Sequence, residues 1–279
     1  MKSSIDIKDI TKKEINKFLY RNTTIIKSGW FSRFNALKGL YKYALARQYV
    51  KTIPLPYILP KYHQCFSPYI YSKSELKHIF STALRYPKNK ICTSPRTVQA
   101  VLVLIYALGL RRSEALAITI GDIDMRNSFV LINNSKFYKS RIVPFNKKIK
   151  LFLEKYLQWR IRHNQYYSSR SPLFLGKNGE ILKADTLHGI FQQIRKKAGI
   201  YRNNSDFQPR IHDLRHSFAV HRLLIWYKKN KNINELLPIL STYMGHISIA
   251  STTRYLTITD ELLKKAGEKF EKYFAGEKI

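Results

Sequence analysis

Four short segments of this sequence combine residue types that can handle a phosphate group. In the first, an apolar run stops at Gly109 and Arg111 follows two residues later. A guanidinium fixed at such a turn offers a planar fork of donors that matches phosphate oxygens. An arginine after a helix-ending glycine is more often a cap or a surface residue, so this segment alone is a weak signal.

The second segment is a polar stretch between two apolar runs. Lys136 lies near its expected turn, and Lys139 follows three residues later. A lysine at the tip of a hairpin can reach into a DNA groove and donate a proton to a departing oxygen. By itself, such a lysine is most often a solvated turn residue.

The third segment reads Arg210-Ile-His-Asp-Leu-Arg-His-Ser-Phe218. If it is helical, His212 and Arg215 lie three residues apart and share one face. An imidazole beside a guanidinium suits a phosphate that must be held while protons move nearby. An ordinary cluster on a helix surface would explain this segment about as well.

The fourth segment ends at Tyr255. Gly245 is expected to end one helix and His246 to lie in the turn. Ser248 can cap a second helix, which places Tyr255 two turns further on. The chain holds 19 tyrosines, so any single one is far more often a packing or surface residue. The joint occurrence of the four segments in this order is what indicates a functional site.

The charge of the chain indicates a polyanionic partner. Lys and Arg number 50 against 18 Asp and Glu, a formal charge of +32 over 279 residues. This excess opposes folding through self-repulsion, and a nucleic-acid partner is the leading explanation for it. An anionic membrane surface is the alternative, but the longest apolar run, residues 100–110, is too short to span a bilayer. Residues 1–9 show no signal pattern, so we expect a cytoplasmic protein without a membrane partner.

The sequence offers few ligands for a metal ion. Cys65 and Cys92 lack metal-ligand spacing and cannot form a disulfide framework. Acidic residues are scarce, and no glycine-rich phosphate loop or paired-carboxylate motif is present. We therefore expect that any chemistry on DNA proceeds without a metal.

The elements that carry these segments fall into two expected domains, of which residues 1–60 form the first. Thr11 and Glu14 make a capping-box pattern that opens a helix over residues 12–20. A second amphipathic helix is expected over about residues 31–50. The first domain is therefore a small helical unit.

This first unit is itself basic, with 13 Lys and Arg against 3 Asp and Glu in the first 70 residues. Lys38 and Lys42 lie mostly off the apolar stripe of the second helix. They either clamp DNA or belong to a solvated surface, and the two alternatives are about equal for each lysine. The proline-rich stretch 52–60 and Pro68 favour extended chain, and residues 61–71 are interpreted as the linker between the domains.

Residues 72–279 are expected to form a mainly helical domain with a small antiparallel sheet. Ser72 and Glu75 make a second capping box, and a change of period indicates two short strands. The expected elements are helices over 73–84 and 97–110, strands over 129–132 and 141–145, a turn over 133–140, and mostly helices after 147. The predicted fold class is α+β, mainly α.

Taken in order, four patterns resemble the tyrosine recombinase (phage integrase) family. They are G-L-R-x-S-E, a lysine near a hairpin turn before R-x-V-P, H-x-L-R-H, and G-H followed by a tyrosine nine residues later. The resemblance covers residues 72–279, and residues 1–60 look like a reduced core-binding domain. The stretch 210–256 most resembles recombinases of mobile elements such as transposons and integrative elements.

The resemblance implies a role for three residues at the scissile phosphate. Arg111 and Arg215 would bind its non-bridging oxygens and stabilise the transition state. Tyr255 would be the nucleophile that forms a 3′-phosphotyrosyl intermediate and frees a 5′-hydroxyl. Because the phosphotyrosine stores the bond energy, the resemblance implies that no cofactor is needed.

The resemblance also implies roles for residues around that phosphate. Lys136 would be the general acid that protonates the departing 5′ oxygen, with Lys139 as its rival. His212 would assist proton transfer, and His246 would donate a hydrogen bond to the phosphate. Arg254, beside the nucleophile, either contacts DNA or belongs to the surface.

The resemblance further implies that the protein acts as a tetramer on paired double-stranded DNA sites, with integration, excision or transposition as the outcome. The short first domain suggests help from a partner recombinase. The amphipathic stretch 260–274 is expected to be a helix that docks either on a neighbouring protomer or on its own domain. Two rival activities remain at this point: a type IB topoisomerase, and a catalytically silent DNA-binding regulator.

Overall fold

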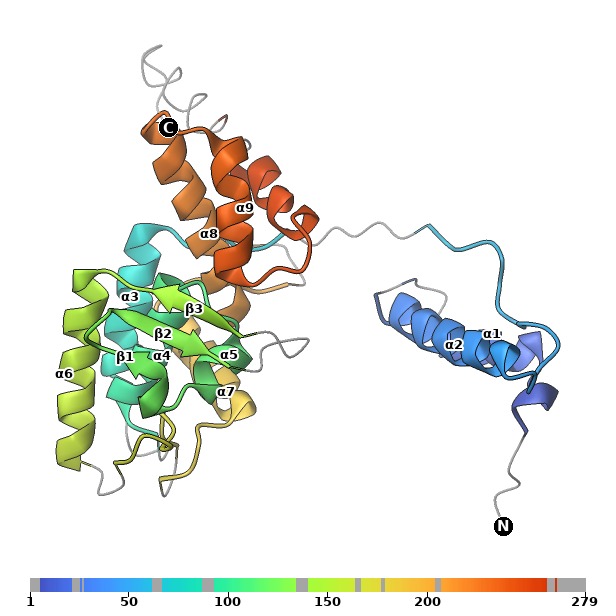
Figure 1. Ribbon diagram of the computed structural model, residues 1–279, viewed down its shortest axis with the longest axis horizontal. Helices are drawn as coiled ribbons and strands as arrows, with labels where there is room; N and C mark the ends of the chain where they lie inside the picture. The colour runs from blue at the N-terminus through green and yellow to red at the C-terminus, as the bar shows by residue number, and fades with distance from the viewer. Residues whose placement is uncertain are drawn as a thin grey trace. The chain divides into compact units, whose positions relative to one another are not determined.

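The computed structural model describes residues 6–21, 26, 28–61, 67–86, 93–133, 140–163, 167–176, 179–203, 207–259 and 264. Contacts divide the chain into two compact units, Met1–Ser67 and Pro68–Ile279 (Figure 1). The described part is mostly helical with one small antiparallel sheet, which confirms the predicted fold class.

The first unit is built on two α-helices. A short 3-10 helix, η1 (Ile7–Asp9), precedes α1 (Lys12–Tyr20) and α2 (Ser28–Ala46). The predicted capping box at the start of α1 is present, because the Thr11 and Glu14 side chains each bond the other's backbone N–H. The buried side chains that join the two helices include Ile15, Leu19, Trp30, Phe34 and Tyr41.

Helix α2 differs from the prediction at both ends. It begins at residue 28 and ends at Ala46, whereas the apolar pattern predicted residues 31–50. Gln48 takes a left-handed φ of 61°, and the N–H of Tyr49 donates to the carbonyl of Ala44 at 2.8 Å. The chain therefore turns back after α2, and this turn buries Val50 in the same small core.

The second unit is centred on helix α4 (Pro95–Ala107). This helix contacts α3 (Lys73–Leu84), α6 (Lys147–His163) and α8 (Ile211–Lys228). The predicted capping box of Ser72 and Glu75 opens α3. Helix α4 ends three residues earlier than expected, because Gly109 takes a left-handed φ of 60° and stops the helical path. Helix α5 (Arg112–Ala117) begins directly after this turn.

The sheet contains β1 (Ile123–Asp124), β2 (Phe129–Ile132) and β3 (Arg141–Pro144), which pair antiparallel in that order. The two predicted strands are confirmed, although β3 ends one residue earlier than expected. Strand β1 follows the 3-10 helix η3 (Ile120–Asp122) and was not predicted, because two residues are too few for an alternating pattern.

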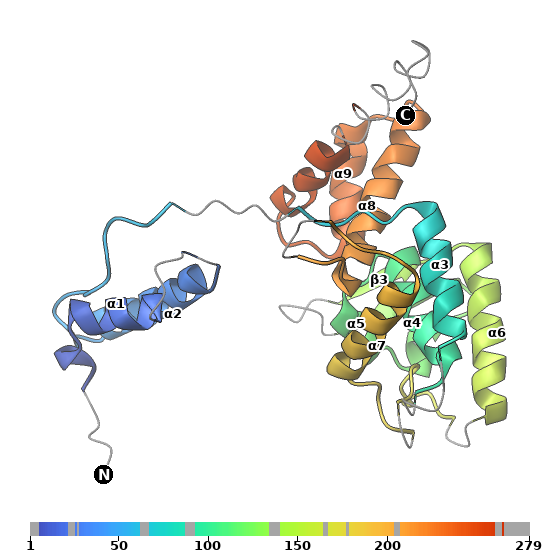
Figure 2. The same ribbon diagram turned by 180° about the vertical axis from the view of Figure 1, so that it is seen from behind.

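The remaining helices are α6 (Lys147–His163), α7 (Ala184–Lys197), α8 (Ile211–Lys228) and α9 (Ile233–Met244), followed by helical residues 250–259. Figures 1 and 2 show α8, α9 and residues 250–259 gathered at one end of the unit, with α6 along another edge. Among the described helices, none is long and apolar enough to cross a membrane. The expected helix over 260–274 lies outside the described residues, apart from residue 264.

Candidate active site

One pocket of about 480 Å³ collects most of the residues that the sequence singled out. Its walls come from the α4–α5 turn, α8, the turn after α9 and helical residues 250–259. The lining residues are Arg111, His212, Arg215, His216, His246, Ala250, Ser251, Arg254 and Tyr255. Five of the six expected catalytic residues therefore lie around a single pocket, together with Arg254.

The other expected site residues lie elsewhere. Lys38 and Lys42 are exposed on α2 of the first unit. Lys136 and Lys139 fall in residues 134–139, outside the described residues. Within the described ranges, no group of three or more His, Cys, Asp or Glu residues could hold a metal ion.

The turn between α4 and α5 places Arg111 because it packs tightly on α8. A Cβ atom on Gly109 would lie 2.4 Å from the ring of Phe218, so only glycine fits this approach. The carbonyl of Gly109 also accepts a hydrogen bond from Arg215 Nη1 at 2.7 Å. This turn thus joins the first expected segment to the third.

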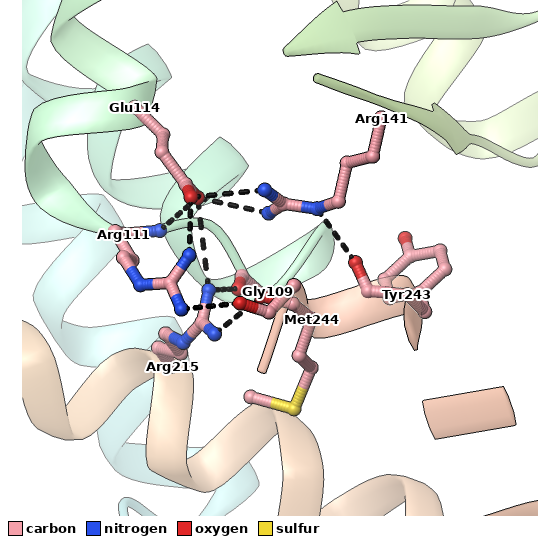
Figure 3. A network of polar contacts seen from close by, with 8 residues as sticks. Gly109, Arg111, Glu114, Arg141, Arg215, Tyr243 and Met244 are labelled. Carbon is pink, nitrogen blue, oxygen red and sulfur yellow. Dashed lines mark hydrogen bonds and ion pairs between the residues drawn. The ribbon is translucent and has the colours of Figure 1, made fainter. Parts of the chain in front are cut away.

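A buried carboxylate, Glu114, lies among three arginines (Figure 3). It accepts hydrogen bonds from the backbone and Nη1 of Arg111 at 2.8 and 2.6 Å, and from both terminal nitrogens of Arg141 at 2.9 Å. Arg215 Nη1 lies 3.7 Å from it. Burial alone would raise the pKa of Glu114, but hydrogen bonds from Arg141 and Arg111 outweigh it and lower the pKa to about 2.

The same three arginines hold the end of α9 (Figure 3). The carbonyls of residues 243–245 accept, in order, from Arg141 Nε at 2.9 Å, Arg215 Nη2 at 2.6 Å and Arg111 Nη2 at 2.5 Å. The last carbonyls of a helix lack partners within the helix, and cations near them are favourable. His246 follows directly, so its position is coupled to that of the arginines.

The pocket carries an excess of positive charge that an anion can balance. Three guanidinium groups share the single carboxylate of Glu114. Arg215 is 1% exposed, and burial together with repulsion from Arg111 lowers its pKa to about 10, so it stays charged at neutral pH. A bound phosphate would supply the missing negative charge, and two of these arginines line the pocket.

Tyr255 is buried, with 3% of its surface exposed. Its hydroxyl lies 2.9 Å from His216 Nδ1, and its ring stacks on that of His246 with 6.2 Å between centroids. His246 Nδ1 lies 2.7 Å from Thr252 Oγ1, which ties it to the same helix. Burial raises the pKa of Tyr255, and the positive charge of Arg215 opposes that rise.

The histidines of the pocket are held in the neutral form. Burial, followed by nearby positive charge, lowers the pKa of His216 to about 3 and that of His246 to about 4. His212 is more open to solvent, and the same two causes lower its pKa as well. Near pH 7 all three imidazoles are therefore uncharged.

Sequence reasoning did not identify Glu114, Arg141 and His216 as site residues. Each nevertheless lies inside a pattern quoted above, in G-L-R-x-S-E, R-x-V-P and H-x-L-R-H respectively. Their types alone did not reveal their contacts, because the groups they touch are 27 residues away for Arg141 and 39 for His216.

Comparison with known proteins agrees with this fold and pocket. Residues 72–261 match the phage integrase family. A Sinorhizobium fredii protein named as a candidate integrase/recombinase, y4rB, is 32% identical over 249 residues, covering 88% of this chain and 79% of its own. Tyrosine recombinase XerC of Bacillus subtilis is 29% identical over 237 residues, covering 83% and 71%.

Solved structures show the same fold. XerH recombinase, in a post-cleavage complex with palindromic difH substrate, superimposes with a TM-score of 0.67 at 23% identity, covering 95% of this chain and 74% of its own. The Tn1549 transposon integrase with circular intermediate DNA gives 0.65 at 16% identity, covering 89% and 82%. The family match and the named relatives define a DNA strand-transferring enzyme. The chain belongs to the phage integrase family of tyrosine recombinases.

Proposed function

We propose that this recombinase cleaves and rejoins double-stranded DNA at specific sites through a 3′-phosphotyrosyl bond to Tyr255, in the integration, excision or transposition of a mobile element. The observation that carries the proposal is the pocket itself. It sets a buried phenol beside two arginines whose positive charge is only partly balanced. Relatives named integrase/recombinase and a transposon integrase of the same fold support the biological outcome.

Arg111 and Arg215 bind the non-bridging oxygens of the scissile phosphate. Both guanidiniums are already held by Glu114 and by backbone carbonyls, so they need little reorganisation when charge develops on phosphorus. His246 donates a hydrogen bond to the phosphate, and Arg254 adds a contact at the open side of the pocket.

The proton transfers involve groups on both sides of the phosphate. Lys136 is the general acid for the departing 5′ oxygen, with Lys139 as the alternative donor. His212 assists proton transfer from its place in the pocket wall. The phosphotyrosine conserves the energy of the broken bond, so the reaction needs no cofactor.

The first unit, residues 1–60 by sequence, serves as a reduced DNA-binding domain ahead of the linker. Lys38 and Lys42 project from α2 into solvent, where they can reach DNA phosphates. The active assembly is a tetramer on paired DNA sites in the cytoplasm, completed by a partner recombinase where the short first unit is insufficient. Structures of the same fold include a dimer of lambda integrase bound to a core site.

The covalent bond is the decisive test of this function. The protein is incubated with a nicked suicide substrate that carries the end sequence of its own element, and a denaturing gel reveals any protein–DNA adduct. We expect an adduct with the native chain and none with Tyr255→Phe, because the phenylalanine lacks the attacking oxygen.

DNA affinity is measured in parallel, and Tyr255→Phe should bind as tightly as the native chain. Tight binding without an adduct, even with added partner recombinase, would contradict the catalytic proposal and favour a silent regulator. Relaxation of unrelated supercoiled plasmid by the chain alone would instead indicate a type IB topoisomerase.

A further inference from the structure

A histidine outside the expected catalytic set contacts the oxygen of the nucleophile. Tyr255 Oη lies 2.9 Å from Nδ1 of His216, and the two ring centroids are 5.5 Å apart. We propose that His216 accepts the phenolic proton of Tyr255 as the phenol attacks the scissile phosphate, and returns it during strand rejoining. This inference rests on the proposed function and assigns the base that activates its nucleophile.

The burial of the nucleophile makes such an acceptor necessary. Tyr255 is only 3% exposed, so bulk water has little access to its hydroxyl. A phenol must lose its proton to become a strong nucleophile, and a base within hydrogen-bond distance provides the shortest route. His216 satisfies the distance requirement before any DNA is bound.

The helix that carries His216 also places a second histidine next to it. His212 lies one turn earlier on α8, and the two rings meet edge to face with centroids 4.7 Å apart. His212 is the more exposed of the two. A proton taken by His216, the more buried of the two histidines, thus lies next to the more exposed ring of His212.

Burial, together with positive groups on the surrounding elements, lowers the pKa of His216 and keeps it unprotonated in the free protein. The positive groups are Arg210 and Arg215, from α8 and its start, and Arg254 from residues 250–259. A phosphate held by Arg111 and Arg215 brings negative charge into the same pocket. That charge stabilises a protonated imidazole, so His216 becomes a better base when the substrate is bound.

The step balances in both directions. In cleavage, the Oη–H bond of Tyr255 breaks and the proton moves to Nδ1 of His216, while the Oη–P bond forms and the P–O5′ bond breaks. The 5′ oxygen takes a separate proton from the general acid. In rejoining, the 5′-hydroxyl gives its proton to the deprotonated general acid as its oxygen attacks phosphorus and the P–O5′ bond forms. The Oη–P bond breaks, and the departing Tyr255 oxygen recovers the proton from His216.

The test compares two leaving groups on the same suicide substrate, a normal 5′ oxygen and a bridging 5′ sulfur. Sulfur departs without protonation, so it rescues a variant that lacks the general acid but not one that lacks the base. His216→Gln keeps a hydrogen-bond acceptor near Tyr255 but cannot carry the proton. We expect it to slow adduct formation by about 10²–10⁴-fold on both substrates.

Lys136→Ala is the matched variant for the opposite side of the phosphate, and sulfur should restore its adduct formation. Melting temperature and DNA affinity of His216→Gln are measured first. If that variant does not fold, His216→Ala with added imidazole replaces it, and imidazole should restore the rate.

Three results would overturn the assignment of His216. The first is cleavage by His216→Gln within about threefold of the native rate, which corresponds to a change of less than about 1 kcal/mol in the activation barrier. The second is rescue of that variant by the sulfur substrate. The third is failure of imidazole to restore cleavage by His216→Ala. Absence of an adduct with the native chain would instead refute the proposed function, so the two failures are distinguishable.

Discussion

Glu114 is the residue on which the arrangement of the pocket depends most. One buried carboxylate faces three guanidinium groups that come from the α4–α5 turn, β3 and α8. Without its charge, Arg111, Arg141 and Arg215 would repel one another in surroundings that screen poorly. Arg111 and Arg215, which we propose to bind the scissile phosphate, can therefore lie close together because Glu114 offsets part of their charge.

The charge on Glu114 should make stability depend on pH. Its pKa is about 2 in the folded chain against 4.5 ordinarily, so its contribution is present above about pH 4.5 and is lost as the pH falls towards 2. We expect Glu114→Gln to lower the free energy of unfolding at pH 7 by something on the order of 3 kcal/mol. Denaturant unfolding at several pH values measures this difference, which should shrink as the pH falls.

The control for this prediction is Glu180→Gln, which alters an exposed carboxylate outside the arginine network. It should change the free energy of unfolding by less than about 0.5 kcal/mol at any pH. A loss in Glu114→Gln that stayed constant from pH 7 to pH 3 would mean that the carboxylate charge does not hold the arginines.

At the scale of elements, two turns bring the catalytic segments together. The α4–α5 turn packs on α8 through Gly109, and the end of α9 is capped by arginines from three other elements. Gly245 also takes a left-handed φ of 67°, and a Cβ atom there would lie 2.8 Å from Arg141 Nη1. The backbone of Gly109 lies against Phe218, and that of Gly245 lies against Arg141. These two close approaches position the neighbouring Arg111 and His246.

Gly109→Ala tests the first turn, with Gly199→Ala as a matched control. Both glycines have φ near +60°, but a Cβ atom at Gly199 has no neighbour within 4 Å. We expect Gly199→Ala to cost about 1 kcal/mol through backbone strain alone. Gly109→Ala should cost about 2–4 kcal/mol because it also displaces the ring of Phe218. Equal losses in thermal or denaturant unfolding would show that the close approach is not needed.

Arg141→Met tests the cap of α9. The change removes two hydrogen bonds to Glu114 and one to the carbonyl of Tyr243. We expect a loss of about 2–3 kcal/mol in the free energy of unfolding, as for hydrogen bonds to charged groups. The rate of adduct formation should fall more than DNA affinity does, since His246 shifts while Arg111 and Arg215 remain.

Arg126→Met provides the comparison, because it removes an exposed arginine from the same sheet region. Its effect on unfolding should stay within about 0.5 kcal/mol. If the two variants lost stability equally, the contacts of Arg141 with Glu114 and α9 would be unimportant.

For the molecule as a whole, charge is the dominant property. A formal charge of +32 predicts DNA binding that is strong at low salt and weakens steeply as counterions compete. The first unit contributes to this charge through the exposed lysines of α2. Most of the basic residues lie in the second unit. Each lysine or arginine that contacts a phosphate should therefore add to the slope of log DNA affinity against log salt concentration.

Replacing Lys38 and Lys42 together by alanine should weaken binding to specific and unrelated DNA alike. If each lysine neutralises one phosphate, the slope of log affinity against log salt should become about 1.8 less negative. Fluorescence anisotropy between low and moderate salt measures that slope. Lys155→Ala, on α6 outside the pocket, should leave it nearly unchanged. An unaltered slope in the double variant would mean that neither lysine contacts a DNA phosphate and that both are ordinary solvated surface residues.

Local signals in the sequence predicted most of the elements and several of the pocket residues, but neither β1 nor His216. The capping boxes at Thr11 and Ser72 begin helices where expected, since a cap depends only on residues three apart. Helix ends were less accurate, because α2 and α4 stop where left-handed residues let tertiary packing turn the chain. Lys136 and Lys139 remain predictions, as they lie outside the described residues.

By itself, the sequence determined which residue types flank each turn. It thereby showed the arginines, histidines and tyrosine whose order resembles that of the tyrosine recombinases. Only the tertiary structure decided which side chains touch. Arg111 donates to the carbonyl of Gly245, which is 134 residues away in the sequence. His216 on α8 contacts the hydroxyl of Tyr255, which belongs to another helix. Such contacts follow from how close-packed helices approach one another in space, and sequence spacing does not encode that distance.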